Sequence, residues 1–272
     1  MHYLSVSNES TQITSFSLYN MTEERSRYPE DVDLKSMFDL ASSLVSFMRR
    51  EGNYKWIFCE GSDDKLYLQN MLRDYKDYFI IPLGGCGNVI KLYQILCGFI
   101  SEKSEKAKLR GLFLIDTDIQ RIQVKEPFQY SNVPCPLVLK RLQLVKGTIN
   151  LLDATNSGTY DKTEMEDCLD PYIYYQAIFE AIKRFGDRSL KTIIKKYQYV
   201  SDAKCSRIRG DDSCIRATDV KYLDKKQKII DFVENDANKY QIAELYTSLC
   251  EGKEVNHPLA DKIALLLELE KK

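Results

Sequence analysis

The chain has 272 residues, a formal net charge of −1 at pH 7 and 44% hydrophobic residues, as expected for a soluble globular protein with a sizeable core. A nearly neutral chain does not attract nucleic acid through its overall charge, so a site that binds a polyanion must be a local basic patch. The eight cysteines include no CxxC pair and there are two histidines, which disfavours a zinc finger or ribbon. Because neither a signal peptide nor a membrane-spanning run is visible, we expect a cytoplasmic protein with reduced thiols.

Residues 33–50 are expected to form a helix, because their apolar side chains recur at helical spacing. From residue 55 onward, short apolar runs alternate with helical patterns. The runs cover 56–59, 80–83 and 112–115, and the intervening helices begin near Asp63 and Asn88. This alternation predicts an α/β fold with a parallel sheet and right-handed crossovers.

The rest of the chain predicts one more strand and then helices. The strand is expected over 143–152, and a helix is expected from Glu164 towards Phe185. We therefore expect three regions: an N-terminal segment with one helix, a central sheet domain, and a helical, locally basic C-terminal region (1–54, 55–185 and 186–272).

The basic stretch lies within residues 183–228, where fourteen Lys or Arg stand against six Asp. Such a stretch is either a solvated surface or a sequence-blind contact to a phosphate backbone. The candidate nucleic-acid-binding residues are Lys195, Lys196, Arg207 and Arg209.

Each of the three apolar runs ends in groups suited to holding a metal ion or a phosphate. The first precedes Glu60, Gly61 and Asp64, the second the glycine-rich stretch 84–88, and the third the Asp116-Thr117-Asp118 sequence. The carboxyl ends of parallel strands meet at one sheet edge, where α/β proteins bind ligands. Carboxylates gathered there cannot all stay ionised without a cation, and oxygen ligands suit Mg²⁺ or Mn²⁺. Taken singly, these residues also suit a helix cap, a tight turn and a loop.

In this order, the segments CEGSDDKLYL, PLGGCGNV and LFLIDTD resemble the TOPRIM domain of topoisomerases, bacterial primases and OLD-family (overcoming lysogenization defect) nucleases. They look most like the OLD branch and its stand-alone relatives in phage defence, over about residues 55–185. The resemblance implies a TOPRIM-type parallel sheet flanked by helices. It also implies catalytic acids at Glu60, Asp116 and Asp118, and metal ligands at those residues and at Asp64 and Glu166, with Glu164 and Asp167 as alternatives to Glu166.

The chain departs from the family pattern at two places. Gln120 stands where topoisomerases have a third acid, and the family's late lysine has no clear counterpart. The segment NHPLADKIA offers His257, with Lys253 and Lys262 nearby.

The resemblance implies an Mg²⁺-dependent endonuclease that hydrolyses DNA or RNA by a two-metal mechanism, as an effector of anti-phage defence. The expected partners are the nucleic-acid substrate, an SMC- or ABC-type ATPase and a second copy in a homo-oligomer, with no membrane. Two alternatives stay open at this point. One is a non-catalytic TOPRIM module that docks on an ATPase, and the other is a receiver-like phosphotransfer domain.

Overall fold

The structure is a computed structural model that describes seven stretches of the chain. These are residues 2–6, 11–15, 30–50, 54–99, 110–117, 136–155 and 161–272. Contacts divide the chain into two units, residues 1–46 and 47–272. The first holds a hairpin of β1 (His2–Val6) and β2 (Thr11–Ser15) and most of α2 (Glu30–Arg50). The expected regions 55–185 and 186–272 both belong to the second unit.

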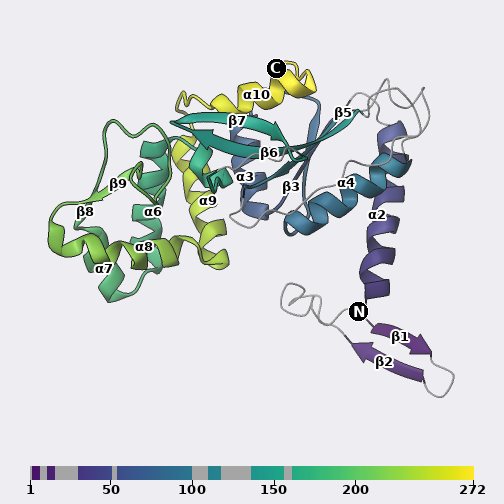
Figure 1. Ribbon diagram of the computed structural model, residues 1–272, viewed down its shortest axis with the longest axis horizontal. Coiled ribbons are helices and arrows are strands. Elements are labelled where there is room, and N and C mark those ends of the chain that lie inside the picture. Colours follow the sequence, from purple (N-terminus) through teal and green to yellow (C-terminus); the bar gives the residue numbers. More distant parts are fainter. Residues whose placement is uncertain are drawn as a thin grey trace. The chain divides into compact units, whose positions relative to one another are not determined.

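The second unit is built around a five-stranded sheet with the order β4-β3-β5-β6-β7 (Figure 1). In chain order its strands are β3 (Lys55–Cys59), β4 (Tyr78–Pro82), β5 (Arg110–Ile115), β6 (Leu137–Val145) and β7 (Thr148–Asp153). The first four pair in parallel, and β7 runs antiparallel to β6. The predicted α/β class, with a largely parallel sheet flanked by helices, is confirmed.

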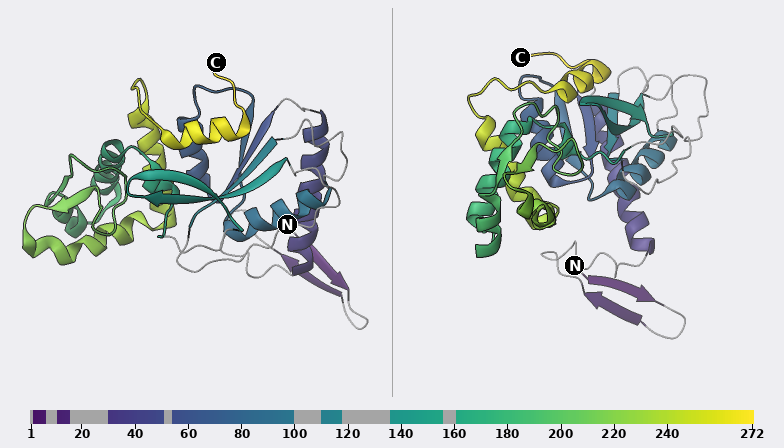
Figure 2. Two further views of the ribbon diagram at one scale, coloured as in Figure 1. Left: turned by 45° about the horizontal axis from the view of Figure 1, so that its top comes forward. Right: turned by 60° about the vertical axis from the view of Figure 1, so that its left-hand side comes forward.

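Helices cover both faces of the sheet (Figure 2). On one side lie α3 (Ser62–Met71) and α10 (Pro258–Leu267), and on the other lies α4 (Cys86–Phe99). Ile57 of β3 belongs to the core beneath α3, whereas its neighbour Phe58 stacks on Phe113, with ring centroids 4.2 Å apart. A strand buried on both faces reads as a continuous apolar run, as β3 and β5 do. The edge strand β4 is also apolar in sequence, but Ile80 is its one buried residue.

The remaining elements gather beyond the sheet edge, on the left of Figure 1. They are η2 (Met165–Cys168), α6 (Pro171–Phe185), α7 (Arg188–Ile194), β8 (Tyr197–Tyr199), β9 (Ile215–Ala217), η3 (Val220–Lys225), α8 (Lys226–Val233) and α9 (Asp236–Cys250). Helix α9 packs against both α6 and α3 and so joins this region to the sheet. No helix within the described stretches has the length and apolar character to cross a membrane.

Two of the predicted elements were wrong in detail. The strand expected over 143–152 is a hairpin, because Lys146 and Gly147 both have positive φ values, 50° and 79°, as two-residue hairpin turns require. The helix expected from Glu164 is instead a 3₁₀ turn, η2, followed by the separate helix α6. Helix α6 begins after Asp170, and the Asp170 side chain accepts a hydrogen bond from the Ile173 amide at 2.8 Å. Asp170 and Pro171 together form a standard helix start.

Candidate functional site

Glu60 follows β3 and is held by the glycine-rich stretch after β4. Gly84 and Gly85 both have positive φ values, and both donate amide hydrogen bonds to the Glu60 carbonyl oxygen, at 2.7 and 3.0 Å. The Glu60 Oε1 atom accepts a hydrogen bond from the Asp116 amide at 2.8 Å. These amides are therefore engaged within the protein, and the stretch positions Glu60 against the end of β5.

A matched pair of glycine substitutions tests whether the backbone conformation of this stretch requires glycine. Gly85 has a φ of 115° with open space around a new Cβ atom, whereas Gly87 lies in α4 with similar space and an ordinary backbone. We expect Gly85→Ala to cost about 1–3 kcal/mol through backbone strain and Gly87→Ala to be neutral or stabilising by up to about 1 kcal/mol. Urea unfolding measures both, and equal effects would contradict the assigned strain.

Asp116 is brought to the other acids by a bridge between two threonines. Thr117, the residue after it, exchanges two backbone hydrogen bonds with Thr163, at 2.8 and 2.9 Å. The Thr117 hydroxyl also donates to the Leu142 carbonyl, and the Thr163 hydroxyl accepts from the Leu144 amide at 3.1 Å. Because Thr163 leads directly into η2, the bridge places Glu166 beside the end of β5.

Four acids from four segments influence one another at this edge. Burial raises the pKa of Asp64 well above its ordinary value, and the nearby charges of Asp63, Glu166 and Glu60 raise it further. Burial also raises the pKa of Asp116, with added repulsion from Asp64, Glu60 and Glu166. Asp64 is 6% exposed, and its carboxylate accepts a hydrogen bond from the Gly61 amide at 2.8 Å. Thus it caps α3 and also belongs to the acidic group.

Lys239 of α9 is the cation that faces these acids. Its Nζ atom lies 3.5 Å from Glu166 Oε1 and 3.9 Å from Glu164 Oε1. Burial alone would lower the pKa of Lys239, but the attraction of Glu166, Asp63, Asp116 and Asp64 raises it. For Glu166 burial raises the pKa, and Lys239 opposes that effect. Lys239 was not among the residues that the sequence singled out.

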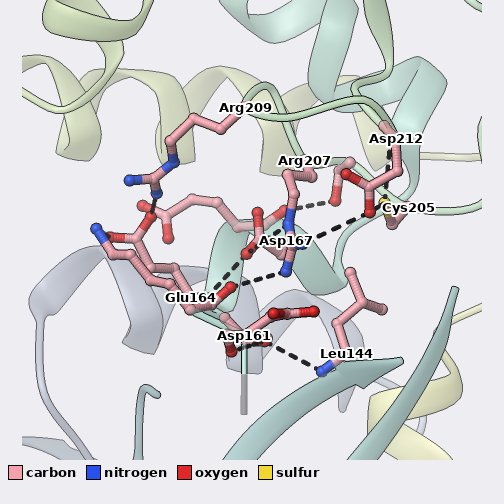
Figure 3. Close-up of polar contacts among 12 residues, drawn as sticks. Leu144, Asp161, Glu164, Asp167, Cys205, Arg207, Arg209 and Asp212 are labelled. Carbon is pink, nitrogen blue, oxygen red and sulfur yellow. Dashed lines mark hydrogen bonds and ion pairs between the residues drawn. The ribbon is translucent and has the colours of Figure 1, made fainter. Parts of the chain in front are cut away.

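Arg207 and Arg209 are held by acids around η2 (Figure 3). Arg207 pairs with Asp167 and with Asp212, each at 3.5 Å, and donates to the Lys162 carbonyl at 2.8 Å. Arg209 pairs with Glu164 and with Glu234.

Burial raises the pKa of Asp167 to about 6 despite the opposing charge of Arg207. The two arginines thus fix the turn that carries Glu166, whereas Lys195 and Lys196 are exposed beside β8.

The expected ligand set is brought together only in part. Glu60, Asp64, Asp116 and Glu166 share one electrostatic environment, and Asp118 lies outside the described residues. Within the described stretches, no three His, Cys, Asp or Glu side chains form a group that could hold a metal ion.

The three residues considered for the late basic position lie at the other end of α3. Arg73, just after α3, donates hydrogen bonds to the carbonyls of Cys250 and Lys253, and His257 lines a cavity of about 460 Å³ together with Arg73. Asp64 stands nine residues before Arg73, which is about 13 Å along the helix axis. Lys253, His257 and Lys262 are therefore remote from Asp64, and Lys239 takes the place beside the acids.

His257 instead predicts a pH dependence of folding. It is 7% exposed, its two ring nitrogens have no hydrogen-bond partner, and burial and Arg73 lower its pKa below 6.5. Its contribution to stability is therefore complete above pH 6.5 and is lost as the pH falls towards its folded-state pKa, by at most about 1.4 kcal/mol per pH unit. Thermal unfolding of wild type and His257→Asn between pH 8 and 5 should show the stability difference shrinking on acidification. A constant difference would contradict this.

The site thus combines buried acids of raised pKa with one facing lysine at the carboxyl edge of a parallel sheet. Carboxylate oxygens and a lysine ammonium group are the kinds of group that bind a hard cation and an anionic substrate. Comparison with protein-family models, with curated proteins and with solved structures finds no match for this chain.

Proposed function

We propose that the protein is a divalent-metal-dependent nuclease of the TOPRIM type that hydrolyses phosphodiester bonds of DNA or RNA. The observation that carries the proposal is the convergence of Glu60, Asp116 and Glu166, from separate segments, at the end of three neighbouring parallel strands. The strand order, with β3 between β4 and β5, supports the same interpretation, because it gathers the three motifs at one edge.

The donor atoms suit Mg²⁺ or Mn²⁺ in their chemistry, because they are carboxylate oxygens whose mutual repulsion a cation would relieve. The described side chains do not themselves form a metal-binding group, so the proposal includes Asp118 and a movement of the acids when the ion binds. The residues that would hold the metal are Glu60, Asp64, Asp116 and Glu166, together with Asp118. When bound, divalent ions would lower the pKa of a coordinated water and stabilise the leaving oxygen, which are the roles in a two-metal hydrolysis.

The chain's own residues supply the setting for this chemistry. Glu60 is fixed by backbone hydrogen bonds before any substrate arrives, so its carboxylate needs little reorganisation. Lys239 is a permanent positive charge beside Glu166 and can neutralise the charge that develops on the phosphoryl group. This makes Lys239 our candidate for the place of the family's late lysine, which had no clear counterpart in the sequence.

The test is cleavage of plasmid DNA, single-stranded DNA and tRNA with Mg²⁺ or Mn²⁺. We expect the wild type to cleave at least one substrate. The rates of Glu60→Ala and Asp116→Ala should fall by more than about a hundredfold, because even the loss of a residue that only supports a metal ligand can lower activity by that factor. Glu244→Gln, an exposed acid on α9, is the matched control and should cleave normally. Absence of cleavage, or equal cleavage by the alanine variants, would exclude this function.

A further inference from the structure

We infer that a surface of α6, α7 and β8 binds single-stranded nucleic acid, with bases stacking on tyrosine and phosphates contacting lysine and arginine. We call it the aromatic surface, and it consists of Tyr172, Tyr175, Phe179 and Tyr199 with the basic residues of 183–196. The inference rests on the proposed nuclease function and specifies the form of the substrate.

The rings of the aromatic surface form one continuous cluster. Tyr172, Tyr175 and Phe179 follow one another along one side of α6 at helical spacing, and Tyr199 of β8 contacts the first two. The ring centroid of Tyr199 lies 5.1 Å from that of Tyr172 and 5.9 Å from that of Tyr175, and the centroids of Tyr175 and Phe179 lie 6.1 Å apart.

Within the cluster, Tyr172 is the ring available to a ligand. It is 49% exposed, whereas Tyr175, Phe179 and Tyr199 are partly buried against the core. Its hydroxyl accepts a hydrogen bond from Gln176 Nε2 at 3.2 Å. A ring held in this way loses little freedom on binding, which favours stacking by a flat ligand.

The charge beside these rings is complementary to a phosphate backbone. Residues 183–196 carry six Lys or Arg against one Asp. Of these, Lys183 Nζ lies 4.8 Å from the centroid of Phe179 and is paired with Glu180 at 2.8 Å. Lys195 and Lys196 are exposed immediately before β8. Unlike Arg207 and Arg209, they are placed to meet a ligand from solvent.

An exposed aromatic ring beside a group of cations suits the recognition of single strands. Each unpaired base has a flat face that can stack on tyrosine, so such binding tolerates any sequence. In a duplex those faces are covered by neighbouring base pairs, so a tyrosine ring cannot stack on them without disrupting the helix. The aromatic surface should therefore prefer single strands to a duplex of equal length.

The experiment measures binding by the full-length chain in EDTA, where metal-dependent cleavage cannot consume the probe. Fluorescence anisotropy is followed with labelled oligothymidylate and oligouridylate of about 20 nucleotides, long enough to exceed a typical single-strand site, and with a blunt duplex. We expect tighter binding of the single strands, and a decrease in affinity of about five- to a hundredfold for Tyr172→Ala. Tyr172→Phe should bind much more tightly than Tyr172→Ala, because it keeps the stacking face and loses only the hydrogen bond from Gln176.

Two further variants separate charge from stacking. Lys195→Ala combined with Lys196→Ala should reduce the slope of log affinity against log salt by about 0.7 for each phosphate that the protein no longer neutralises. Leu265→Ala removes an apolar side chain of α10 that is 83% exposed and should leave binding unchanged.

The inference is overturned if single strands do not bind, if the duplex binds more tightly, or if Tyr172→Ala binds like the wild type. Cleavage with Mg²⁺ is scored separately on the same preparations. If the wild type cleaves and Tyr172→Ala binds as tightly as the wild type, the aromatic surface is rejected and the nuclease proposal is kept. If single strands bind through Tyr172 but no substrate is cleaved, the nuclease proposal is rejected and the binding surface is kept.

Discussion

Asp116→Asn is expected to stabilise the metal-free protein while removing its cleavage activity. Asp116 is surrounded by Asp64, Glu60 and Glu166, and burial and these charges raise its pKa. Like charges about 6 Å apart repel by roughly 3 kcal/mol at an effective dielectric of 20. We therefore expect a gain of about 1–3 kcal/mol at pH 7.5, or roughly 2–12 °C in Tm.

The pH dependence of this gain follows from the direction of the pKa shift. Because the folded-state pKa lies above the ordinary value of 3.8, the folded wild type binds more protons than the unfolded chain between the two values. Its stability therefore falls as the pH rises through that range. Thermal unfolding in EDTA should show the advantage of Asp116→Asn growing with pH and vanishing below about pH 4.

Added Mg²⁺ distinguishes the metal proposal from a purely structural effect. A ligand that binds only the folded state stabilises it in proportion to the logarithm of its concentration. The wild type should therefore gain stability in about 10 mM Mg²⁺ on the order of 1–3 kcal/mol, and Asp116→Asn should gain less. Glu244→Gln should behave as the wild type, and equal responses of all three proteins would contradict a site at Asp116.

Lys239→Met is expected to have the second large effect, in two assays. Removing the ammonium group takes away the cation 3.5 Å from Glu166, whereas Glu164 keeps its ion pairs with Arg209 and Lys162. Removing one partner from a fully buried pair costs about 3–5 kcal/mol. Because the Lys239 side chain is 24% exposed, we expect about 1–3 kcal/mol in metal-free unfolding. Cleavage should fall by about 10²–10³-fold if Lys239 stabilises developing charge.

Lys239→Arg is the control, because it keeps the charge and should keep most of the stability. Metal binding gives an independent readout: Lys239→Met should bind Mg²⁺ more tightly in calorimetry, since a competing cation is gone. Wild-type cleavage and unchanged Mg²⁺ affinity in Lys239→Met would show that this lysine has only a structural role.

The sequence predicted the first three strands of the sheet, of which β3 and β5 are buried on both faces. Continuous apolar runs marked β3, β4 and β5, and the acidic or glycine residues after them marked the sheet edge. The hairpin of β6 and β7 was missed, because Lys146 is a non-glycine residue with a positive φ and its side chain does not indicate a turn. The short strands β8 and β9, three residues each, are too short to show a period.

The residues at or just after a strand end, Glu60, Asp64 and Asp116, could be predicted from the sequence pattern, and Glu166 was predicted through the family resemblance. Glu60 and Asp116 directly follow apolar runs, so the sheet edge could be deduced for both. Lys239 depends on how α9 packs on α3 and α6, a contact between segments far apart in the chain. A signal existed, since Lys239 shares a helix face with Ile242, Ala243 and Tyr246, which are buried. A lysine in an otherwise apolar stripe indicates a buried partner of opposite charge.

The bridge between Thr117 and Thr163 also has a mechanical consequence. Its paired amide bonds fasten the chain just after Asp116 and just before η2. The strands β6 and β7 lie between the two threonines in the sequence, so the bridge joins two segments that are far apart in the chain. The spacing of Asp116 and Glu166 is therefore set by this contact and not by their separation in the sequence.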